Sequence, residues 1–309
     1  MSNNNNPIKG VLSPVVTPFG DDLQPDVDRL IRQCKWLIEN DVGLALFGTN
    51  SEANSLSTGE KLDMLERLVG AGLPPERMMP GTGCCSITDS VELTRRAVEL
   101  GAGGVLMLPP FYYKGVSDEG LYRNFAEVIQ RVGDERLRIY LYHIPPVAQV
   151  PISLGLIERL LKDFPGTIAG IKDSSGEWDN TRKMLKLFQP EGFDVFAGSE
   201  TFLLDTLRGG GAGCISATAN VNPGPIARLA ATWKQKDPDE QQAELDSVRS
   251  IFQGYVMIPA LKAAIAHFSG DPTWMRVRPP LVQMNPQQKS QLVEQLDQAR
   301  FEMPGLRAS

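Results

Sequence analysis

The chain has 309 residues, of which 42% are hydrophobic and 22% are charged, so it can bury a large core and does not have the composition of a disordered protein. Its formal net charge of −6 offers no overall attraction to nucleic acid or to an anionic membrane, although a small anionic substrate needs only a few local donors. We find no apolar run of about 18 residues and no signal-peptide pattern in MSNNNNPIKG, so we expect no transmembrane helix and no secretion signal.

The cysteines and histidines limit the disulfides and metal sites that the chain can form. The cysteines are Cys34, Cys84, Cys85 and Cys214. They contain no Cys-x-x-Cys pair, so we expect reduced thiols in a cytoplasmic protein. The two histidines, His143 and His267, are too few for a histidine-rich metal site.

Short apolar runs alternate along the chain with longer amphipathic stretches. The predicted strands are GVLSPVVTPF (10–19), VGLALFGT (42–49), RMMPGTG (77–83), GGVLMLPP (103–110), LRIYLYHIP (137–145), TIAGIKDS (167–174), FDVFAGSE (193–200) and AGCISATAN (212–220). Such short, apolar runs are typical of parallel strands that are covered on both faces.

The stretches between these runs have helical spacing of apolar residues. The clearest predicted helices are 26–40, 86–103, 117–132 and 152–166. A repeated strand–helix pattern of this length predicts an α/β protein with a (β/α)₈ TIM barrel. We expect a polar tail over residues 1–9 and the barrel over residues 10–235.

Beyond residue 221 the pattern is helical only. The predicted helices are 223–235, 238–255, 258–270 and 286–302. The first of these closes the last barrel unit, and no low-complexity linker follows it. We therefore expect residues 236–309 to form a C-terminal helical extension packed on the barrel.

Lys172 interrupts one of the apolar runs, in TIAGIKDSSG (167–176). The active site of a (β/α)₈ barrel lies at the C-terminal ends of its strands, and Lys172 is at such an end. Apolar surroundings disfavour the charged form of a lysine, and a neutral amine can attack a ketone to form a Schiff base. The alternatives are a lysine that reaches solvent or one that pairs with Asp173.

Tyr142, at the end of the preceding strand, is the natural proton donor and acceptor for such an imine. Lys262 is the competing nucleophile, because it lies in the apolar helix IPALKAAIAHF, but that helix is outside the barrel repeat. His143 follows Tyr142 and should point to the opposite face of its strand, in a packing or hydrogen-bonding role. Catalysis by Cys84 or Cys85 is not expected.

Several motifs in order resemble those of the dihydrodipicolinate synthase / N-acetylneuraminate lyase family of pyruvate-dependent class I aldolases. They are TPF (17–19), GTNSE (48–52), PPFYY (109–113), YHIP (142–145), GIKDSSG (170–176) and ISATANV (215–221). Each motif is weak alone, but the ordered set is specific and extends to about residue 300.

The resemblance implies a role for individual residues. Lys172 would form the Schiff base with pyruvate or another 2-oxo acid, and Tyr142 would be the general acid and base. Thr49 and Asn50 would hold the substrate carboxylate. Tyr112 resembles the tyrosine that reaches across a tight dimer interface, whereas Tyr113 is a less clear match. Gly198 and Ile215 would line the pocket around the imine. The family is usually a homotetramer, a dimer of dimers, and uses no cofactor and no metal.

Two departures from the family pattern bear on the substrate. Asn50 stands where the synthases have a threonine that relays a proton between two tyrosines, and an amide is a poor relay. Val147 stands where the synthases have an arginine that grips the carboxylate of the second substrate, so that bidentate clamp is missing. Both departures disfavour 4-hydroxy-tetrahydrodipicolinate synthase, which remains one alternative.

The remaining candidates are an aldolase for a 4-hydroxy-2-oxo acid or a 2-keto-3-deoxy sugar acid, and a Schiff-base dehydratase of a keto-deoxy sugar acid. By resemblance, relatives that act on 4-hydroxy-2-oxoglutarate also carry the asparagine and a serine at the position of Ser174. Ser174 can therefore bind a substrate hydroxyl, and so can Ser199, Glu200 and Thr201, unless they cap helices.

Two further functional classes fit the sequence less well. A sensor that only binds a 2-oxo acid would not need both Lys172 and Tyr142. A phosphate-binding barrel is disfavoured because AGSE (197–200) and ISATAN (215–220) lack a glycine-rich loop before a helix.

Overall fold

The computed structural model describes residues 8–235 and 237–306, and it divides into two compact units. The first unit contains residues 8–10 and 74–215, and the second contains residues 11–73 and 216–306, apart from residue 236. Most of the expected polar tail, residues 1–7, lies outside the described residues, as do 307–309 at the end of the expected extension. The domain boundaries expected from the sequence stay a prediction.

The first unit is built on parallel strands that pair in chain order. These strands are β3 (Val105–Met107), β4 (Ile139–His143), β5 (Ile168–Asp173), β6 (Asp194–Ala197) and β7 (Gly213–Ile215). Neighbours in the sheet are neighbours in the sequence, which is the order that a repeated strand–helix unit produces. The register sets Tyr142 of β4 beside Lys172 of β5, and Lys172 beside Phe196 of β6.

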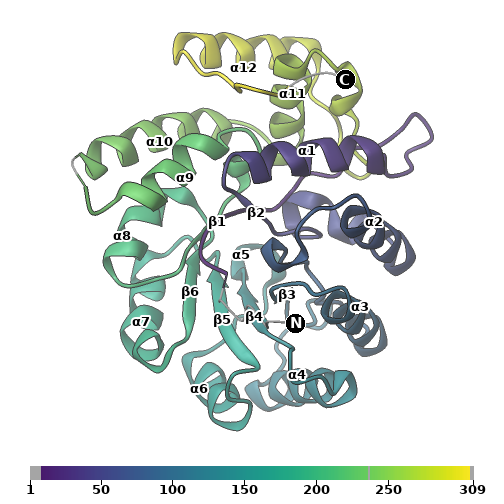
Figure 1. The fold of residues 1–309 in the computed structure, drawn as a ribbon, viewed down its shortest axis with the longest axis vertical. Helices are drawn as coiled ribbons and strands as arrows, with labels where there is room; N and C mark the ends of the chain where they lie inside the picture. The colour runs from purple at the N-terminus through teal and green to yellow at the C-terminus, as the bar shows by residue number, and fades with distance from the viewer. Residues whose placement is uncertain (1–7, 236, 307–309) are drawn as a thin grey trace. The chain divides into compact units, whose positions relative to one another are not determined.

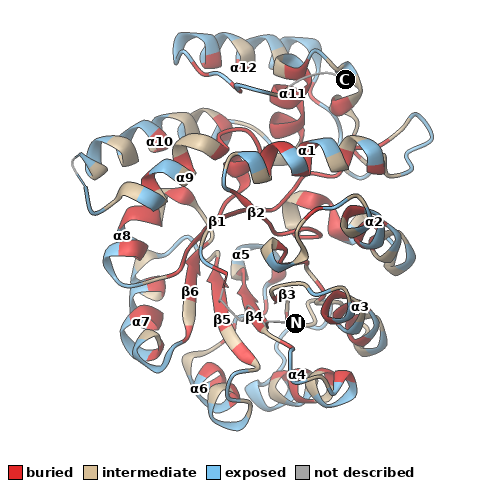
Figure 2. Ribbon diagram, in the orientation of Figure 1, coloured by how far each residue is buried: buried red, intermediate tan, exposed pale blue. Residues whose placement is uncertain are grey.

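Helices connect these strands, and the longer ones lie around them (Figure 1). They are α3 (Ile87–Glu99), α4 (Asp118–Val132), α5 (Pro145–Ala148), α6 (Leu154–Asp163), α7 (Trp178–Phe188) and α8 (Leu203–Arg208), with short 3₁₀ turns η3 (Pro75–Arg77), η4 (Gln189–Glu191) and η5 (Glu200–Phe202). Ser86, Ser117 and Ser153 cap α3, α4 and α6 by accepting a backbone N–H in the first turn. The strands of this unit are buried, and the helices expose their outer faces (Figure 2).

The third predicted strand, 77–83, is reduced to a single bridge between Gly81 and Leu106 of β3. Leu106 N donates to Pro80 O at 2.9 Å and Thr82 N donates to Leu106 O at 3.0 Å. Pro80 has no N–H to extend this ladder, so the segment is extended and paired without becoming a regular strand. The expected position in the strand order is correct, but the expected length is wrong.

The second unit contains most of β1 (Gly10–Ser13), which pairs in parallel with β2 (Gly43–Leu44). Its helices are α1 (Val27–Glu39), α2 (Thr58–Gly70), α9 (Pro223–Thr232), α10 (Pro238–Gln253), α11 (Met257–Ser269) and α12 (Pro286–Gln298), with 3₁₀ turns η1 (Thr49–Ser51), η2 (Ala53–Ser55), η6 (Ala217–Asn220) and η7 (Pro272–Met275). The helical C-terminal pattern predicted from the sequence is therefore present.

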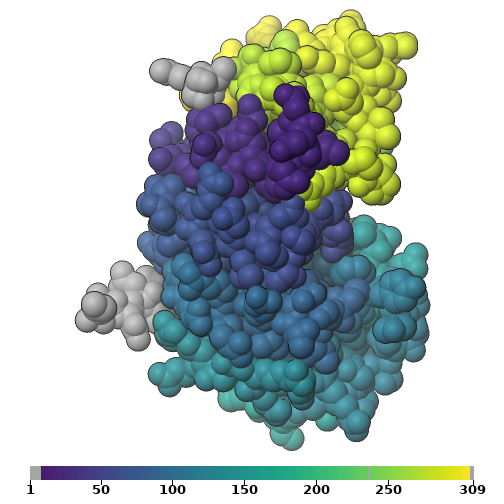
Figure 3. Space-filling view, turned by 90° about the vertical axis from the view of Figure 1, so that its right-hand side faces the viewer, coloured from purple at the N-terminus to yellow at the C-terminus, as the bar shows by residue number. Residues whose placement is uncertain are grey.

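Segments from both ends of the chain pack together within this unit. Residues near the N-terminus, in purple, lie beside C-terminal residues, in yellow (Figure 3). Trp36 Nε1 donates to Pro304 O at 2.9 Å, and Arg29 pairs with Asp271 at 2.7 Å. The buried Asn220 accepts from Val16 N at 3.0 Å and donates to Pro14 O at 3.1 Å. The bonds of Trp36 and Arg29 hold the C-terminal extension against α1, and those of Asn220 hold η6 against the segment after β1.

Among the described residues, no single helix has the length and hydropathy to cross a membrane. Helices α10 and α11 have that length and hydropathy only when they are taken together, and the pair is bent by 108°. All of the cysteines are free thiols, as the sequence predicted.

Candidate active site

Lys172 is almost fully buried on β5, with 2% of its surface exposed. Because side chains alternate along a strand, Lys172 shares a face with Gly170, while Asp173 points the other way. The neighbouring strands supply Tyr142 and Phe196 at the same level. Strand alternation and register therefore put an amine among aromatic side chains near the C-terminal ends of β4, β5 and β6.

The amine of Lys172 meets the hydroxyl of Tyr142. Lys172 Nζ donates to Tyr142 Oη at 3.2 Å and lies 4.3 Å from the centre of the same ring. Tyr142 is itself 3% exposed. The sequence predicted this pair, and the geometry lets one proton pass directly between the two groups.

Two further aromatic side chains pack on the same face of the sheet as the pair. The rings of Tyr140 and Phe196 meet edge to face at 5.7 Å. Gly170 makes room for them, because a Cβ there would lie 2.7 Å from the Tyr140 ring. The Tyr140 ring therefore packs against Gly170, two residues before Lys172 on β5.

Asp173 does not act as the partner of Lys172. Its carboxylate accepts from Thr181 Oγ1 at 2.7 Å, from Asn180 Nδ2 at 3.1 Å and from Ser175 N at 3.0 Å. These donors belong to α7 and to the turn before it, so Asp173 anchors the chain that leaves β5. The ion-paired alternative considered for Lys172 is therefore wrong.

His143 lies on the same outer face as Asp173. Its Nδ1 accepts from Ile152 N at 3.0 Å, and burial lowers its pKa, partly offset by the charge of Asp173. A neutral, hydrogen-bonded ring matches the packing role expected from the sequence.

Ser174 and Gly198 come together where β5 and β6 end. Ser174 N donates to His143 O and Gly198 N donates to Asp173 O, both at 2.7 Å. A Cβ on Gly198 would collide with Ser174 Oγ, so glycine is required for this approach. Ile215, the last residue of β7, is fully buried. Ser199 accepts from Thr201 N and caps η5, which is the structural role weighed for it.

Tyr112 lies in an exposed loop rather than beside the buried pair. It exposes 74% of its surface and meets the ring of Tyr113 edge to face at 5.3 Å. Lys114 Nζ donates to Ala148 O at 2.7 Å and so ties this loop to α5. Tyr113 is also exposed, so the two tyrosines form an aromatic patch on the first unit, and Val147 is exposed as well.

Thr49 and Asn50 lie together in the second unit, in η1. Ser51 shapes this turn, because its Oγ accepts from Gly48 N at 3.2 Å and its carbonyl accepts from Thr17 Oγ1 at 2.7 Å. Glu52 follows in the left-handed region, with φ 56°. The carboxylate-binding role of this turn stays a prediction.

Lys262, the competing nucleophile, is buried in α11 and already engaged. It forms an ion pair with Glu52 and donates to Arg276 O at 2.6 Å. Burial lowers the pKa of Lys262 to about 8, and Glu52 opposes that shift. Glu52 belongs to the GTNSE motif, but the sequence suggested no role for it. No sequence pattern indicated its contact with Lys262, which lies 210 positions away.

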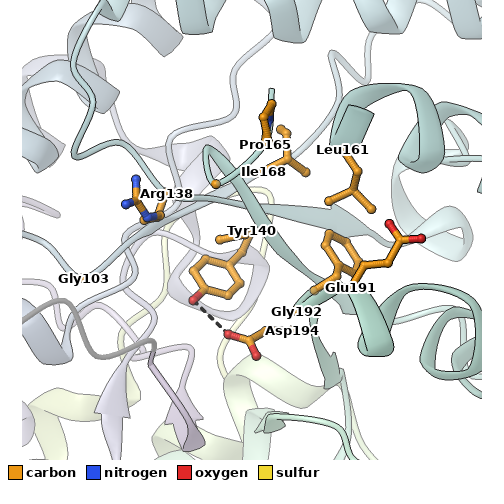
Figure 4. Close-up of a pocket in the computed structure, with 12 residues that line it drawn as sticks. Gly103, Arg138, Tyr140, Leu161, Pro165, Ile168, Glu191, Gly192 and Asp194 are labelled. Carbon is orange, nitrogen blue, oxygen red and sulfur yellow. Dashed lines mark hydrogen bonds between the residues drawn. The ribbon is translucent and has the colours of Figure 1, made fainter. Parts of the chain in front are cut away.

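A cavity of about 380 Å³ lies at the other end of the strands, where β4, β5 and β6 begin (Figure 4). It is lined by Gly103, Arg138, Tyr140, Leu161, Pro165, Gly166, Ile168, Ala169, Glu191, Gly192, Phe193 and Asp194. Tyr140 Oη donates to Asp194 at 3.4 Å, and burial raises the pKa of that carboxyl. None of the predicted catalytic or binding residues lines this cavity.

The buried lysine that donates to a tyrosine lies near the C-terminal ends of parallel strands, where barrel enzymes carry their active sites. The Dihydrodipicolinate synthetase family matches residues 7–299, and the chain belongs to this family.

Individual relatives support the assignment. An uncharacterized DapA-like lyase from Chloroflexus aurantiacus is 33% identical over 268 residues, which are 85% of this chain and 88% of the relative. Dihydrodipicolinate synthase from Agrobacterium tumefaciens is 32% identical, with a TM-score of 0.86 over 94% of this chain and 99% of that chain. YagE from Escherichia coli K12, solved with pyruvate, is 28% identical, with a TM-score of 0.85 over 95% and 99% of the two chains.

These likenesses confirm two predictions. The fold class is the (β/α)₈ barrel with a C-terminal helical extension. The protein is a carbon–carbon lyase of the class I aldolase family.

Proposed function

We propose that the protein acts on a pyruvate-derived 2-oxo acid through an imine on Lys172. One observation carries this proposal: the Nζ atom of a lysine that is 2% exposed lies 3.2 Å from the hydroxyl of Tyr142. Tyr142 contacts this amine and Phe196 lies beside Lys172 on the next strand, so the nucleophile and a proton carrier are held together in a buried site.

The proposed chemistry starts with attack of Lys172 Nζ on the ketone carbon of the substrate. The carbinolamine that forms loses water and leaves an iminium. As the C4 hydroxyl loses its proton, the C3–C4 bond breaks, its electron pair neutralises the iminium and forms an enamine, and C4 leaves in an aldehyde. The enamine is then protonated at C3 and hydrolysed to pyruvate and the free amine. Tyr142 moves the protons, because its hydroxyl contacts the reacting nitrogen.

We further propose that Thr49 and Asn50 bind the substrate carboxylate, as their place in the GTNSE motif indicates. The Asn50 amide can donate to a carboxylate but is a poor proton relay. Ser174, Gly198 and Ile215 would line the pocket around the imine. The bond between Ser174 N and His143 O supports a fixed position for Ser174, which suits recognition of a substrate hydroxyl.

The substrate class that fits best is a 4-hydroxy-2-oxo acid or a 2-keto-3-deoxy sugar acid. Val147, which stands where the synthases have a carboxylate-binding arginine, exposes 61% of its surface and offers no donor from its side chain. Synthesis of 4-hydroxy-tetrahydrodipicolinate is the second candidate, because a relative of 32% identity is named dihydrodipicolinate synthase. A dehydratase that uses the same imine is the third.

We also propose a homotetramer built from tight dimers, in which Tyr112 reaches the neighbouring protomer. Exposed aromatic rings at Tyr112 and Tyr113 support an interface at this patch. Analytical ultracentrifugation of Tyr112→Asp tests it: a shift toward monomers is expected, and an unchanged assembly contradicts the contact. A cytoplasmic location stays a prediction from cysteine usage.

Borohydride trapping with pyruvate is the first test of the imine. We expect a reduced pyruvyl adduct on Lys172 by intact mass and peptide mapping. An adduct only with larger 2-oxo acids would favour a selective aldolase or a dehydratase. No adduct with any 2-oxo acid would refute the proposed chemistry.

A substrate panel then separates the candidates. Release of pyruvate from 4-hydroxy-2-oxoglutarate or 2-keto-3-deoxygluconate identifies an aldolase. Loss of water without pyruvate release identifies a dehydratase. Condensation of pyruvate with aspartate semialdehyde identifies the synthase, and it is expected to be the slowest reaction because Val147 provides no carboxylate clamp.

A further inference from the structure

The turn formed by residues 48–52, here called the GTNSE turn, ends in a buried glutamate with an unusual backbone. Glu52 is 4% exposed and adopts φ 56° and ψ 33°, although it is not a glycine. Left-handed backbone at such a residue persists only when its surroundings hold it there. Its side chain is the obvious holding point.

Both carboxylate oxygens of Glu52 are bound by the C-terminal extension. Oε1 forms an ion pair with Lys262 Nζ from α11, and the two side chains are fully buried. Oε2 accepts from Arg278 N at 2.9 Å. The carboxylate is therefore fixed at two points, and Glu52 has little freedom to turn.

Lys262 is held as firmly as Glu52. Its Nζ also donates to Arg276 O at 2.6 Å and lies 4.5 Å from the centre of the Phe19 ring. The ammonium thus connects α11, the segment after η7 and the loop after β1 to the GTNSE turn. A charge pair costs more to bury than apolar side chains of the same size, so its role is better sought in positioning than in stability.

We propose that the buried Glu52–Lys262 pair positions the GTNSE turn for binding the substrate carboxylate, so that helix α11 sets the affinity of the enzyme for its 2-oxo acid. The inference rests on the proposed function of Thr49 and Asn50. Glu52 is the last residue of the turn that carries both residues, and rotation at Glu52 would move their donors. The pair does not touch the reacting atoms in this scheme, so it should control binding more than the chemical step.

The test compares pyruvate with methyl pyruvate, which keeps the ketone but lacks the anionic carboxylate. Glu52→Gln retains the shape of the side chain and removes its charge. Borohydride trapping on Lys172 is measured against the concentration of each ketone. For Glu52→Gln, we expect half-maximal trapping to need at least about 10-fold more pyruvate than for the wild type. The concentration of methyl pyruvate at half-maximal trapping should change little. The maximal trapping rate should also change little.

Glu60→Gln is the matched control. Glu60 binds the Arg278 guanidinium at 2.5 Å, so the control removes a carboxylate from the same cluster but leaves the Lys262 pair intact. Its concentration dependence should stay within about threefold of the wild type. An equal effect in both variants would show a general loss of structure and would overturn the inference.

A second variant keeps the test decisive if Glu52→Gln does not fold. The double variant Glu52→Gln/Lys262→Met removes both charges and leaves no buried ion unpaired. It should show the same selective loss for pyruvate. Unchanged pyruvate dependence in either folded variant, with the adduct still on Lys172, would overturn the positioning role. A wild type that traps no 2-oxo acid would instead refute the proposed function.

Discussion

Lys172 and Lys262 are both buried, but their amines have different partners. Lys172 is on a strand of the first unit and donates to a tyrosine hydroxyl. Lys262 is on a helix of the second unit and meets a carboxylate and a backbone carbonyl. The first partner can exchange a proton with the amine, whereas the second pair holds the ammonium in place.

The difference teaches that burial alone does not identify a nucleophile. Burial lowers the pKa of Lys262, and the carboxylate of Glu52 opposes that shift. A neutral partner such as Tyr142 adds no negative charge, but Glu52 favours the ammonium and restrains it from attacking a ketone. The residues that surround a buried lysine therefore decide between catalysis and structure.

Removing the Lys172 amine should have the largest effect. Lys172→Met keeps a side chain of similar length without a nucleophile, so turnover should fall to background and no borohydride adduct should form. Lys262→Met is the matched control, and it should still form the adduct on Lys172 at saturating pyruvate. An adduct on the Lys172→Met protein would show that another amine does the chemistry.

Removing the Tyr142 hydroxyl should have the next largest effect. Tyr142→Phe keeps the ring beside the amine but loses the proton carrier, so turnover should drop by roughly 10²–10⁴. Tyr140→Phe removes a hydroxyl from the same face of the same strand, where it contacts Asp194 at the other end. In single-turnover kinetics, the rate of Tyr140→Phe should stay near that of the wild type. Similar losses in both variants would argue against a specific role for Tyr142.

Much of the first unit could be predicted from the sequence, because strand periodicity carries direct spatial information. Alternation put Tyr142 and His143 on opposite faces, and chain order put Tyr142 one strand away from Lys172. The third strand was predicted too long, because the missing N–H of Pro80 limits pairing even where the segment is apolar and buried.

The second unit was harder to predict. The Glu52–Lys262 pair joins residues 210 positions apart, and neither its spacing nor its composition marks the contact. The left-handed conformation of Glu52 also has no signal, since glutamate rarely adopts it. The sequence indicated that Lys262 could be buried. Only its ion pair with Glu52 shows that the buried ammonium holds another segment of the chain.

Removing the Lys262 ammonium should affect stability more than chemistry. Lys262→Met leaves Glu52 buried without its cation, which should cost about 3–5 kcal/mol of unfolding free energy. Urea denaturation measures this loss. The double variant Glu52→Gln/Lys262→Met should recover most of it, since both charges are then absent. A single variant as stable as the wild type would mean that the pair does not hold these segments.

The smallest effect is the pH dependence of stability that Lys262 contributes. Its pKa falls from 10.5 to about 8 in the folded protein, chiefly through burial. Between these values the unfolded chain keeps a proton that the folded protein has lost, so this contribution to stability rises with pH. Relative to Lys262→Met, the wild type should gain about 2 kcal/mol between pH 7.5 and pH 10 in parallel denaturation curves. A constant difference across that range would mean that Glu52 keeps Lys262 protonated, and the contrast with Lys172 would then be sharper still.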